Sequence, residues 1–113
     1  MPIDQRKALS ALDGNRTLLS QLAIIFAEDA PKLVRSFRAA LAADDFANAR
    51  LAVHSLKGLT ASFYDSLAVE RLASIEHACA ARHGGMLESA GEDVASTIDS
   101  LIDEMRQSEL LHH

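Results

Sequence analysis

One apolar pattern runs through the first half of the chain and limits the folds open to it. Between residues 19 and 41 the pattern recurs at steps of three and four residues, at Leu19, Leu22, Phe26, Ala30, Leu33, Phe37 and Leu41. This spacing is that of a helix with one buried face. The register continues across Pro31, so we predict one long helix that is kinked there, because proline removes a backbone hydrogen bond. A break into two helices at Pro31 is the lesser alternative.

Capping residues divide the rest of the chain into further helices. Gly14 closes a short first helix, and Gly84-Gly85 is expected to stop the fourth helix near Ala81. The last helix is expected to start at Leu87. Short polar residues that can accept hydrogen bonds from a first helical turn precede the other stretches, at Asp4, Asn15, Asp44-Asp45 and Asp65-Ser66. We therefore predict an all-α protein, an antiparallel up-down four-helix bundle with a short extra N-terminal helix over one end.

Length and composition restrict the class of protein. A chain of 113 residues supports a single domain spanning residues 1–113, and its formal charge of −5 argues against non-specific nucleic-acid binding. One cysteine, Cys79, cannot form an internal disulfide and is read as core packing. The longest apolar run, Leu22 to Ala27, is too short to span a membrane, and no apolar run follows the basic residues near the start. We expect a monomeric cytoplasmic domain that has no membrane association.

The most informative helix spans residues 46–63. On a helical projection His54 falls almost opposite the apolar face, with Lys57 and Gly58 one turn further on. Glycine lowers helix stability by roughly 1 kcal/mol relative to alanine, so Gly58 suggests that the space beside His54 is used by a bulky group. A surface histidine beside a surface lysine is also common in proteins without any such function. The apolar face itself consists of Ala49, Ala52, Leu56, Leu59 and Phe63.

The stretch His54-Ser55-Leu56-Lys57-Gly58 resembles the His-x-Leu-Lys-Gly signature of histidine phosphotransfer (HPt) domains. The segments Gly14–Leu19 and Phe26–Pro31 are similar to those that precede the histidine helix in many members, and Ile75-Glu76 matches a hydrophobic-Glu pair on the next helix. The resemblance covers roughly residues 3 to 107. It implies a phosphorelay intermediate, which accepts a phosphoryl group from a receiver-domain aspartate and passes it to another.

The resemblance assigns roles to particular residues. His54 would be the phosphoacceptor, Lys57 would stabilise the charge of the phosphoryl oxygens, and Gly58 would leave steric clearance. The partners would be receiver domains of response regulators or hybrid sensor kinases, with Mg²⁺ bound by the receiver and no cofactor bound by this chain. No glycine-rich phosphate loop is present, so we expect no ATP-dependent kinase activity. The alternative is a helical scaffold that binds a receiver or kinase without carrying phosphate.

Glu76 has two open interpretations. It lies at the edge of the buried stripe of its helix, where a carboxylate needs a partner. In the family a polar residue at this position often accepts a hydrogen bond from the histidine Nδ1 and so orients the imidazole. Alternatively, Glu76 forms an ion pair with Arg50, Lys57 or Arg71.

Docking residues are expected around His54, at Arg50, Leu51, Ala61, Tyr64 and Ile24. Ile24 and Ile25 fall off the buried stripe of the long helix. Two interpretations are open and compatible: the first helix covers them through Leu9 and Leu12, or part of this surface forms an apolar docking patch with Leu51.

The sequence departs from the family at two positions. Many members have glycine ten residues after the histidine, where this chain has Tyr64, and a small residue five after it, where this chain has Leu59. We expect Leu59 to point into the core. Projected as a continuation of the helix, Tyr64 lies beyond Lys57 on the same side. It would narrow the choice of receiver or, as the lesser alternative, obstruct docking.

A metal site is the weakest candidate. His77, Cys79 and His83 lack a fourth ligand for zinc, so no metal is assigned. We expect His77 and His83 to be exposed residues of the fourth helix.

Overall fold

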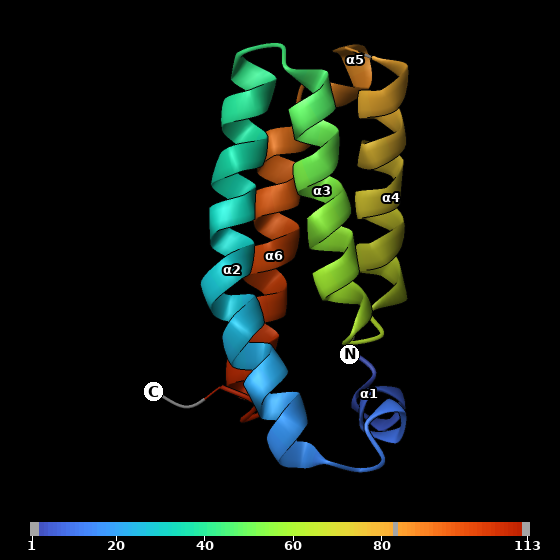
Figure 1. Ribbon diagram of the computed structural model, residues 1–113, viewed down its shortest axis with the longest axis vertical. Helices are drawn as coiled ribbons and strands as arrows, with labels where there is room; N and C mark the ends of the chain where they lie inside the picture. The colour runs from blue at the N-terminus through green and yellow to red at the C-terminus, as the bar shows by residue number, and fades with distance from the viewer. Residues whose placement is uncertain (1–2, 83, 112–113) are drawn as a thin grey trace.

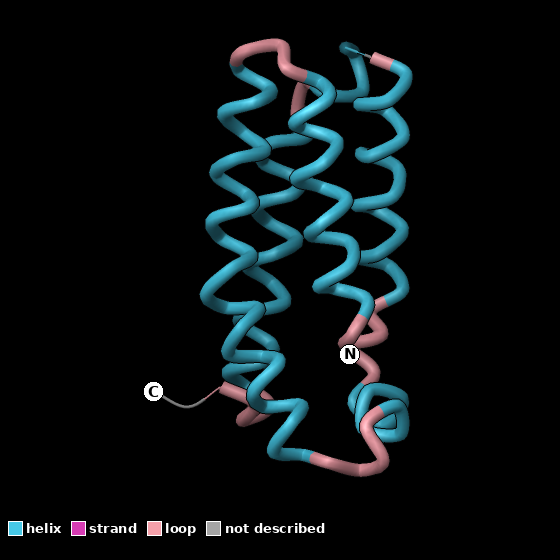
Figure 2. Tube along the Cα trace, in the orientation of Figure 1, coloured by secondary structure: helices cyan, strands magenta, loops and turns pink. Residues whose placement is uncertain are grey.

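The computed structural model describes residues 3–82 and 84–111, and within these ranges the regular structure is entirely helical (Figure 2). Four long helices run alternately up and down, and a short helix lies beneath one end of the bundle (Figure 1). This confirms the predicted architecture. None of the helices in these ranges is long and apolar enough to cross a membrane. The elements are α1 (Gln5–Ala11), α2 (Arg16–Ala42), α3 (Phe46–Ala61), α4 (Ser66–Ala81), α5 (Gly84–Leu87) and α6 (Ala90–Gln107).

The N-cap residues predicted from the sequence are confirmed, and they explain where the first four helices begin. Each capping side chain accepts a hydrogen bond from the backbone N–H three residues later, at 3.0 or 3.1 Å. These bonds satisfy N–H groups that have no partner inside the helix. The caps of α1, α2, α3 and α4 are Asp4, Asn15, Asp45 and Asp65.

Pro31 lies inside α2, which is continuous from Arg16 to Ala42, as predicted. The lower part of α2 bends away from the axis of its upper part (Figure 1). Phe26 and Phe37 on this helix are both fully buried, so the apolar register is kept on both sides of the proline.

Helix α4 ends at Ala81, as predicted, but the expected residues do not stop it. Gly84-Gly85 does not stop α4; the helix ends at Ala81, and Arg82 takes the left-handed conformation (φ 55°) with its N–H bonded to the carbonyls of Ala78 and Cys79. The Arg82 guanidinium lies 5.9 Å from the centre of the Phe46 ring, a cation–π contact that favours this position. The two glycines instead begin α5.

The start of the last helix also differs. α6 begins at Ala90 and not at Leu87, because Leu87 belongs to α5. Leu87 is nevertheless buried, as are Val94, Ile98 and Leu101. The apolar spacing that includes Leu87 therefore extends across the break between α5 and α6, which is why the start of α6 was predicted too early.

Helix α3 packs between α2 and α4. Its buried residues are Ala49, Ala52, Val53, Leu56 and Thr60, so the buried face is rotated slightly from the predicted one. Leu59 is only partly buried at the edge of the core, contrary to the expectation that it points inward. Beyond the helix, Phe63 packs edge-on against Phe26 with the ring centres 5.6 Å apart.

Two backbone N–H groups fix the N-terminal segment beneath the bundle, one bonded to the turn after α3 and one to a side chain of α6. The Asp4 N–H donates to the Phe63 carbonyl at 3.1 Å, and the Ile3 N–H donates to Oε2 of Glu104 at 3.1 Å. Ile3 is itself buried. The short first helix is therefore held against the turn that joins α3 to α4.

Candidate functional site

His54 stands on the outer side of α3, and its side chain is 61% exposed. The neighbouring Val53 and Leu56 are completely buried and fix the rotation of the helix. The imidazole therefore faces solvent as predicted, on a helix that the core holds rigidly.

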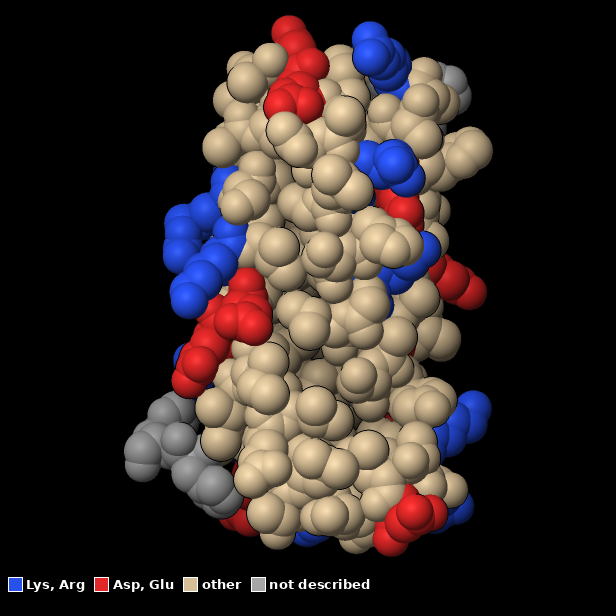
Figure 3. Space-filling model, in the orientation of Figure 1, with Lys and Arg blue, Asp and Glu red and all other residues tan. Residues whose placement is uncertain are grey.

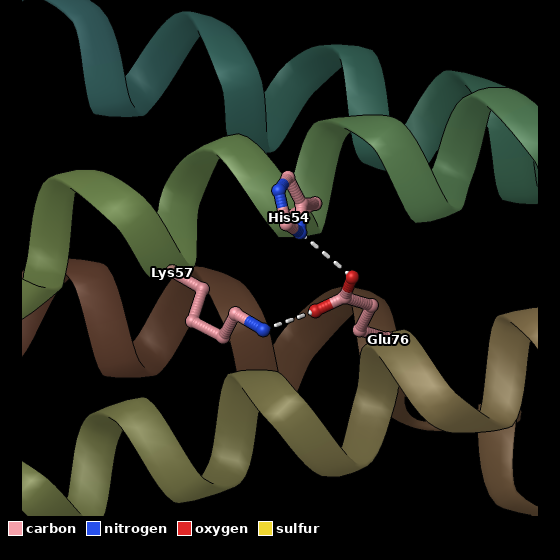
Figure 4. A network of polar contacts seen from close by, with 3 residues as sticks. All are labelled: His54, Lys57 and Glu76. Atoms are coloured by element: carbon pink, nitrogen blue, oxygen red, sulfur yellow. Dashed lines mark hydrogen bonds and ion pairs between the residues drawn. The ribbon is translucent and has the colours of Figure 1, made fainter.

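Glu76 on α4 joins the two functional side chains of α3 (Figure 4). Its Oε2 lies 2.8 Å from Nδ1 of His54, and its Oε1 lies 2.7 Å from Nζ of Lys57. The Glu76 side chain is 16% exposed and that of Lys57 is 30% exposed. Both interpretations of Glu76 therefore hold at once, with Lys57 as the ion-pair partner. Arg50 and Arg71, the other partners considered, form no ion pair within the described ranges.

The charge state of Glu76 determines the tautomer of His54. The pKa of Glu76 is lowered below its ordinary value, chiefly by the hydrogen bond from Lys57. Burial opposes this effect by raising the pKa. The hydrogen bond from His54 lowers the pKa further. An ionised carboxylate can only accept hydrogen bonds, so Nδ1 of His54 is the donor and carries a proton. In the neutral imidazole the lone pair is then on Nε2, the nitrogen that Glu76 does not contact.

Gly58 leaves open space on the same side of α3. A Cβ atom added to Gly58 would meet nothing within 4 Å, and its backbone is ordinary helix. The isolated domain therefore has no steric need for glycine here.

The docking candidates are exposed, and Tyr64 is positioned differently from the projection. Leu51 is 55% exposed and Tyr64 43% exposed. Because α3 ends at Ala61, Tyr64 lies in the following turn, not on the helix face, and its φ is 55°. This left-handed backbone favours glycine, which accounts physically for the glycine that the resemblance places there. Arg50 and Ala61 are exposed on α3.

Ile24 and Ile25 are each 46% exposed, so the idea that the first helix covers them is wrong. Leu9 and Leu12 pack against the core instead. Ser36 lines the groove between α2 and α3 next to Leu51. On a regular helix Ile25 lies about 20° from the direction of Ser36 and Ile24 about 120° from it. This projection favours Ile25, which the docking set omitted, over Ile24 as a residue of the α2 face that borders α3.

The surface between the charged margins of this face is largely uncharged. Figure 3 shows Lys, Arg, Asp and Glu side chains gathered towards the edges of the face on which α2 and α3 lie, with few across its middle. Leu18, Ile25, Leu51 and Tyr64 are exposed apolar or aromatic side chains of these two helices and the adjoining turn. Such a surface is suited to contact with another protein.

The weakest candidate was a zinc site, and the described residues contain no group of side chains that could hold a metal ion. Cys79 is buried in the core and His77 is exposed on α4, as predicted for each, while His83 lies outside the described residues. Burial raises the pKa of the Cys79 thiol, and the nearby Glu76 charge adds to this. A protonated, buried thiol is neither a good ligand nor a nucleophile.

The fold and site together define a helical bundle that presents a histidine oriented by a carboxylate. The profile of the family described as Hpt domain matches residues 21–108. The chain belongs to this family, whose domains act in phosphotransfer within phosphorelays and interact with receiver domains. Among curated proteins, nothing matches the chain. Among solved structures, nothing matches it either.

Proposed function

We propose that this chain is a phosphorelay intermediate that carries the phosphoryl group on Nε2 of His54. The observation that supports this most is the contact of Nδ1 with Glu76 at 2.8 Å, which leaves Nε2 as the nucleophilic nitrogen on an exposed ring. The donor is an aspartyl phosphate of a receiver domain, and the acceptor is a receiver aspartate.

The transfer is a direct exchange of one bond for another. The Nε2 lone pair attacks phosphorus, a bond forms between nitrogen and phosphorus, and the bond from phosphorus to the aspartate oxygen breaks and leaves a carboxylate. Nδ1 keeps its proton, so the ring becomes positively charged. The ionised Glu76 lies 2.8 Å away and stabilises that charge. In the reverse step an aspartate carboxylate attacks phosphorus and the ring leaves as neutral imidazole.

Lys57 has two tasks in this proposal. Its ammonium lies 2.7 Å from Glu76 and is partly exposed, so it can lean towards phosphoryl oxygens on the neighbouring His54 without leaving the carboxylate. Phosphoryl transfer depends chiefly on positioning and on stabilising charge, and a cation at this point serves both. Mg²⁺ is expected on the receiver side of the interface.

The replacement His54→Gln tests the proposal. The chain is incubated with receiver domains phosphorylated by acetyl phosphate, and acid-labile, alkali-stable phosphate is measured. The wild type should be labelled and His54→Gln should not, while the melting temperature stays nearly unchanged because the side chain is 61% exposed. His77→Gln is the matched control, since His77 is also exposed on a helix. A wild-type chain that binds a receiver but never takes up phosphate would instead be a scaffold.

A further inference from the structure

A hollow of about 710 Å³ lies where α1 meets the turn between α3 and α4. Tyr64, Asp65 and Ala61 line it from the turn and the end of α3, and Asp4 and Lys7 line it from the N-terminal segment. The hydrogen bond from the Asp4 N–H to the Phe63 carbonyl ties these two sides together. The hollow is therefore bounded by elements with a fixed relation to each other.

Two carboxylates line this hollow, those of Asp65 and Asp4. Asp65 is only 4% exposed, and its Oδ1 accepts the N–H of Ala68; Asp4 accepts the N–H of Lys7 in the same way. Neither carboxylate takes part in an ion pair within the part of the chain that the structure describes. A nearly buried carboxylate without a counter-charge favours a cationic guest.

Tyr64 supplies an aromatic surface beside these carboxylates. It is 43% exposed and has the positive φ that favours glycine, so its large side chain is held where a smaller residue would be less strained. The face of a tyrosine ring attracts a guanidinium or ammonium group. The aromatic ring and the two carboxylates are together suited to bind a basic side chain.

The hollow lies within reach of a protein docked at His54. Ala61 is two helical turns beyond His54 on nearly the same side of α3, or about 10 Å along the axis. A protein interface of standard size covers about 800 Å² on each partner, a disc of about 16 Å radius. A receiver centred on His54 therefore covers the near wall of the hollow.

We infer that this hollow is a specificity subsite that receives one arginine or lysine side chain of the receiver domain. The inference rests on the proposed function, since the receiver is the protein that brings the side chain. Lys7 is exposed at the rim and carries the same charge as the guest, so it opposes binding. The sign of its effect distinguishes a basic guest from an acidic one.

The experiment uses the full chain and a panel of purified receiver domains phosphorylated with acetyl phosphate. The receiver that labels the chain fastest is taken, and its affinity in the unphosphorylated form is measured at low salt. Asp65→Asn, which keeps a capping side chain, should weaken binding about tenfold, and Tyr64→Gly should weaken it two- to fivefold. Lys7→Ala should strengthen it. Asp103→Asn, which removes one exposed charge on α6, is the control and should stay within twofold.

Each outcome decides the matter. If Asp65→Asn and Asp103→Asn behave alike, or if Lys7→Ala weakens binding, the hollow does not receive a basic side chain. Melting curves show whether Asp65→Asn has lost the cap; if it has, Tyr64→Gly and Lys7→Ala still test the ring and the sign of charge. If the wild type accepts phosphate from no receiver, the proposed function fails and this inference with it. If phosphate is accepted but none of the variants alters binding, only this inference fails.

Discussion

Nδ1 of His54 on α3 lies 2.8 Å from Oε2 of Glu76 on α4, and the other oxygen of the same carboxylate lies 2.7 Å from the Lys57 ammonium. One side chain from a neighbouring helix thus orients the imidazole, which is the proposed nucleophile, and holds the cation beside it. Packing of α3 against α4 is therefore a condition for the chemistry at His54.

Replacing Glu76 should change the tautomer of His54. In Glu76→Ala the Nδ1 proton loses its acceptor, so the two neutral tautomers become more evenly populated and phosphoryl transfer should slow by about tenfold or more. Glu76→Gln keeps an oxygen that can accept the Nδ1 proton and should lie between wild type and Glu76→Ala. The ¹⁵N shifts of the imidazole report the tautomer directly. A tautomer that is the same in all three proteins would show that Glu76 does not orient the ring.

Glu76 should also make stability depend on pH. Its pKa is lowered in the folded protein, chiefly by Lys57, from an ordinary value of 4.5. A lowered carboxyl pKa contributes stability above the ordinary value, and this contribution is lost as the pH falls through the folded value. The free energy of unfolding of wild type relative to Glu76→Gln should therefore be constant near pH 7 and shrink below about pH 4.5. Denaturant titrations from pH 7 to pH 3 measure it, and a difference independent of pH would contradict the prediction.

Lys57→Ala should slow transfer and leave His54 as the acceptor. The change removes charge stabilisation and also leaves Glu76 uncompensated beside an anionic phosphoryl group. Removal of one stabilising group in a water-excluded site typically lowers a rate about a hundredfold or somewhat more. Because Lys57 is partly exposed, we expect the transfer rate to fall by no more than this. Rapid-quench measurements in both directions provide the rates, with Lys32→Ala, an exposed lysine on α2, as the control. Equal rates for wild type and Lys57→Ala would make Lys57 a surface residue only.

The sequence was sufficient to predict most of the fold because helical period and caps are local properties. The stripe from Leu19 to Leu41 passes Pro31 without a change of register, and Asp45 and Asp65 cap the helices that they precede. The end of α4 near Ala81 was predicted, but the residue that terminates the helix was not. Arg82 adopts a backbone that glycine prefers, beside the ring of Phe46 far away in the chain, and no local rule selects that contact.

The same difference holds for the site: positions on one helix were predictable from the sequence, and contacts between helices were not. The spacing of His54, Lys57 and Gly58 on one helix places all three on the open side of α3. The position of Glu76 depends on how α4 is rotated and shifted against α3, which its own sequence does not specify. A carboxylate has two oxygens, so the two alternatives were compatible, and only the packing of the helices shows that both are used. Tyr64 was misplaced because α3 was projected beyond Ala61, where the structure ends it.

Gly58 and Gly91 differ in what a side chain would meet. A Cβ atom on Gly91 would lie 3.4 Å from Nε of Arg38, in van der Waals contact with that side chain. A Cβ atom on Gly58 would meet nothing within 4 Å. Gly58 also has an ordinary helical backbone, which alanine adopts more readily than glycine. In the proposed function its use lies outside the isolated domain, where it leaves space for the phosphoryl group or for the receiver loops that approach His54.

Stability and activity should accordingly move in opposite directions at this position. Gly58→Ala should stabilise the isolated domain by up to about 1 kcal/mol, because alanine is the better helix former and no contact opposes it. Gly58→Gln should keep the fold and impair phosphotransfer, since the longer side chain occupies the space beside His54. Ala80→Gln, at an exposed position of α4, is the control for a glutamine on a helix surface. Melting curves and transfer rates on the three variants measure both effects, and a Gly58→Gln protein that transfers phosphate as fast as the wild type would refute the steric role of Gly58.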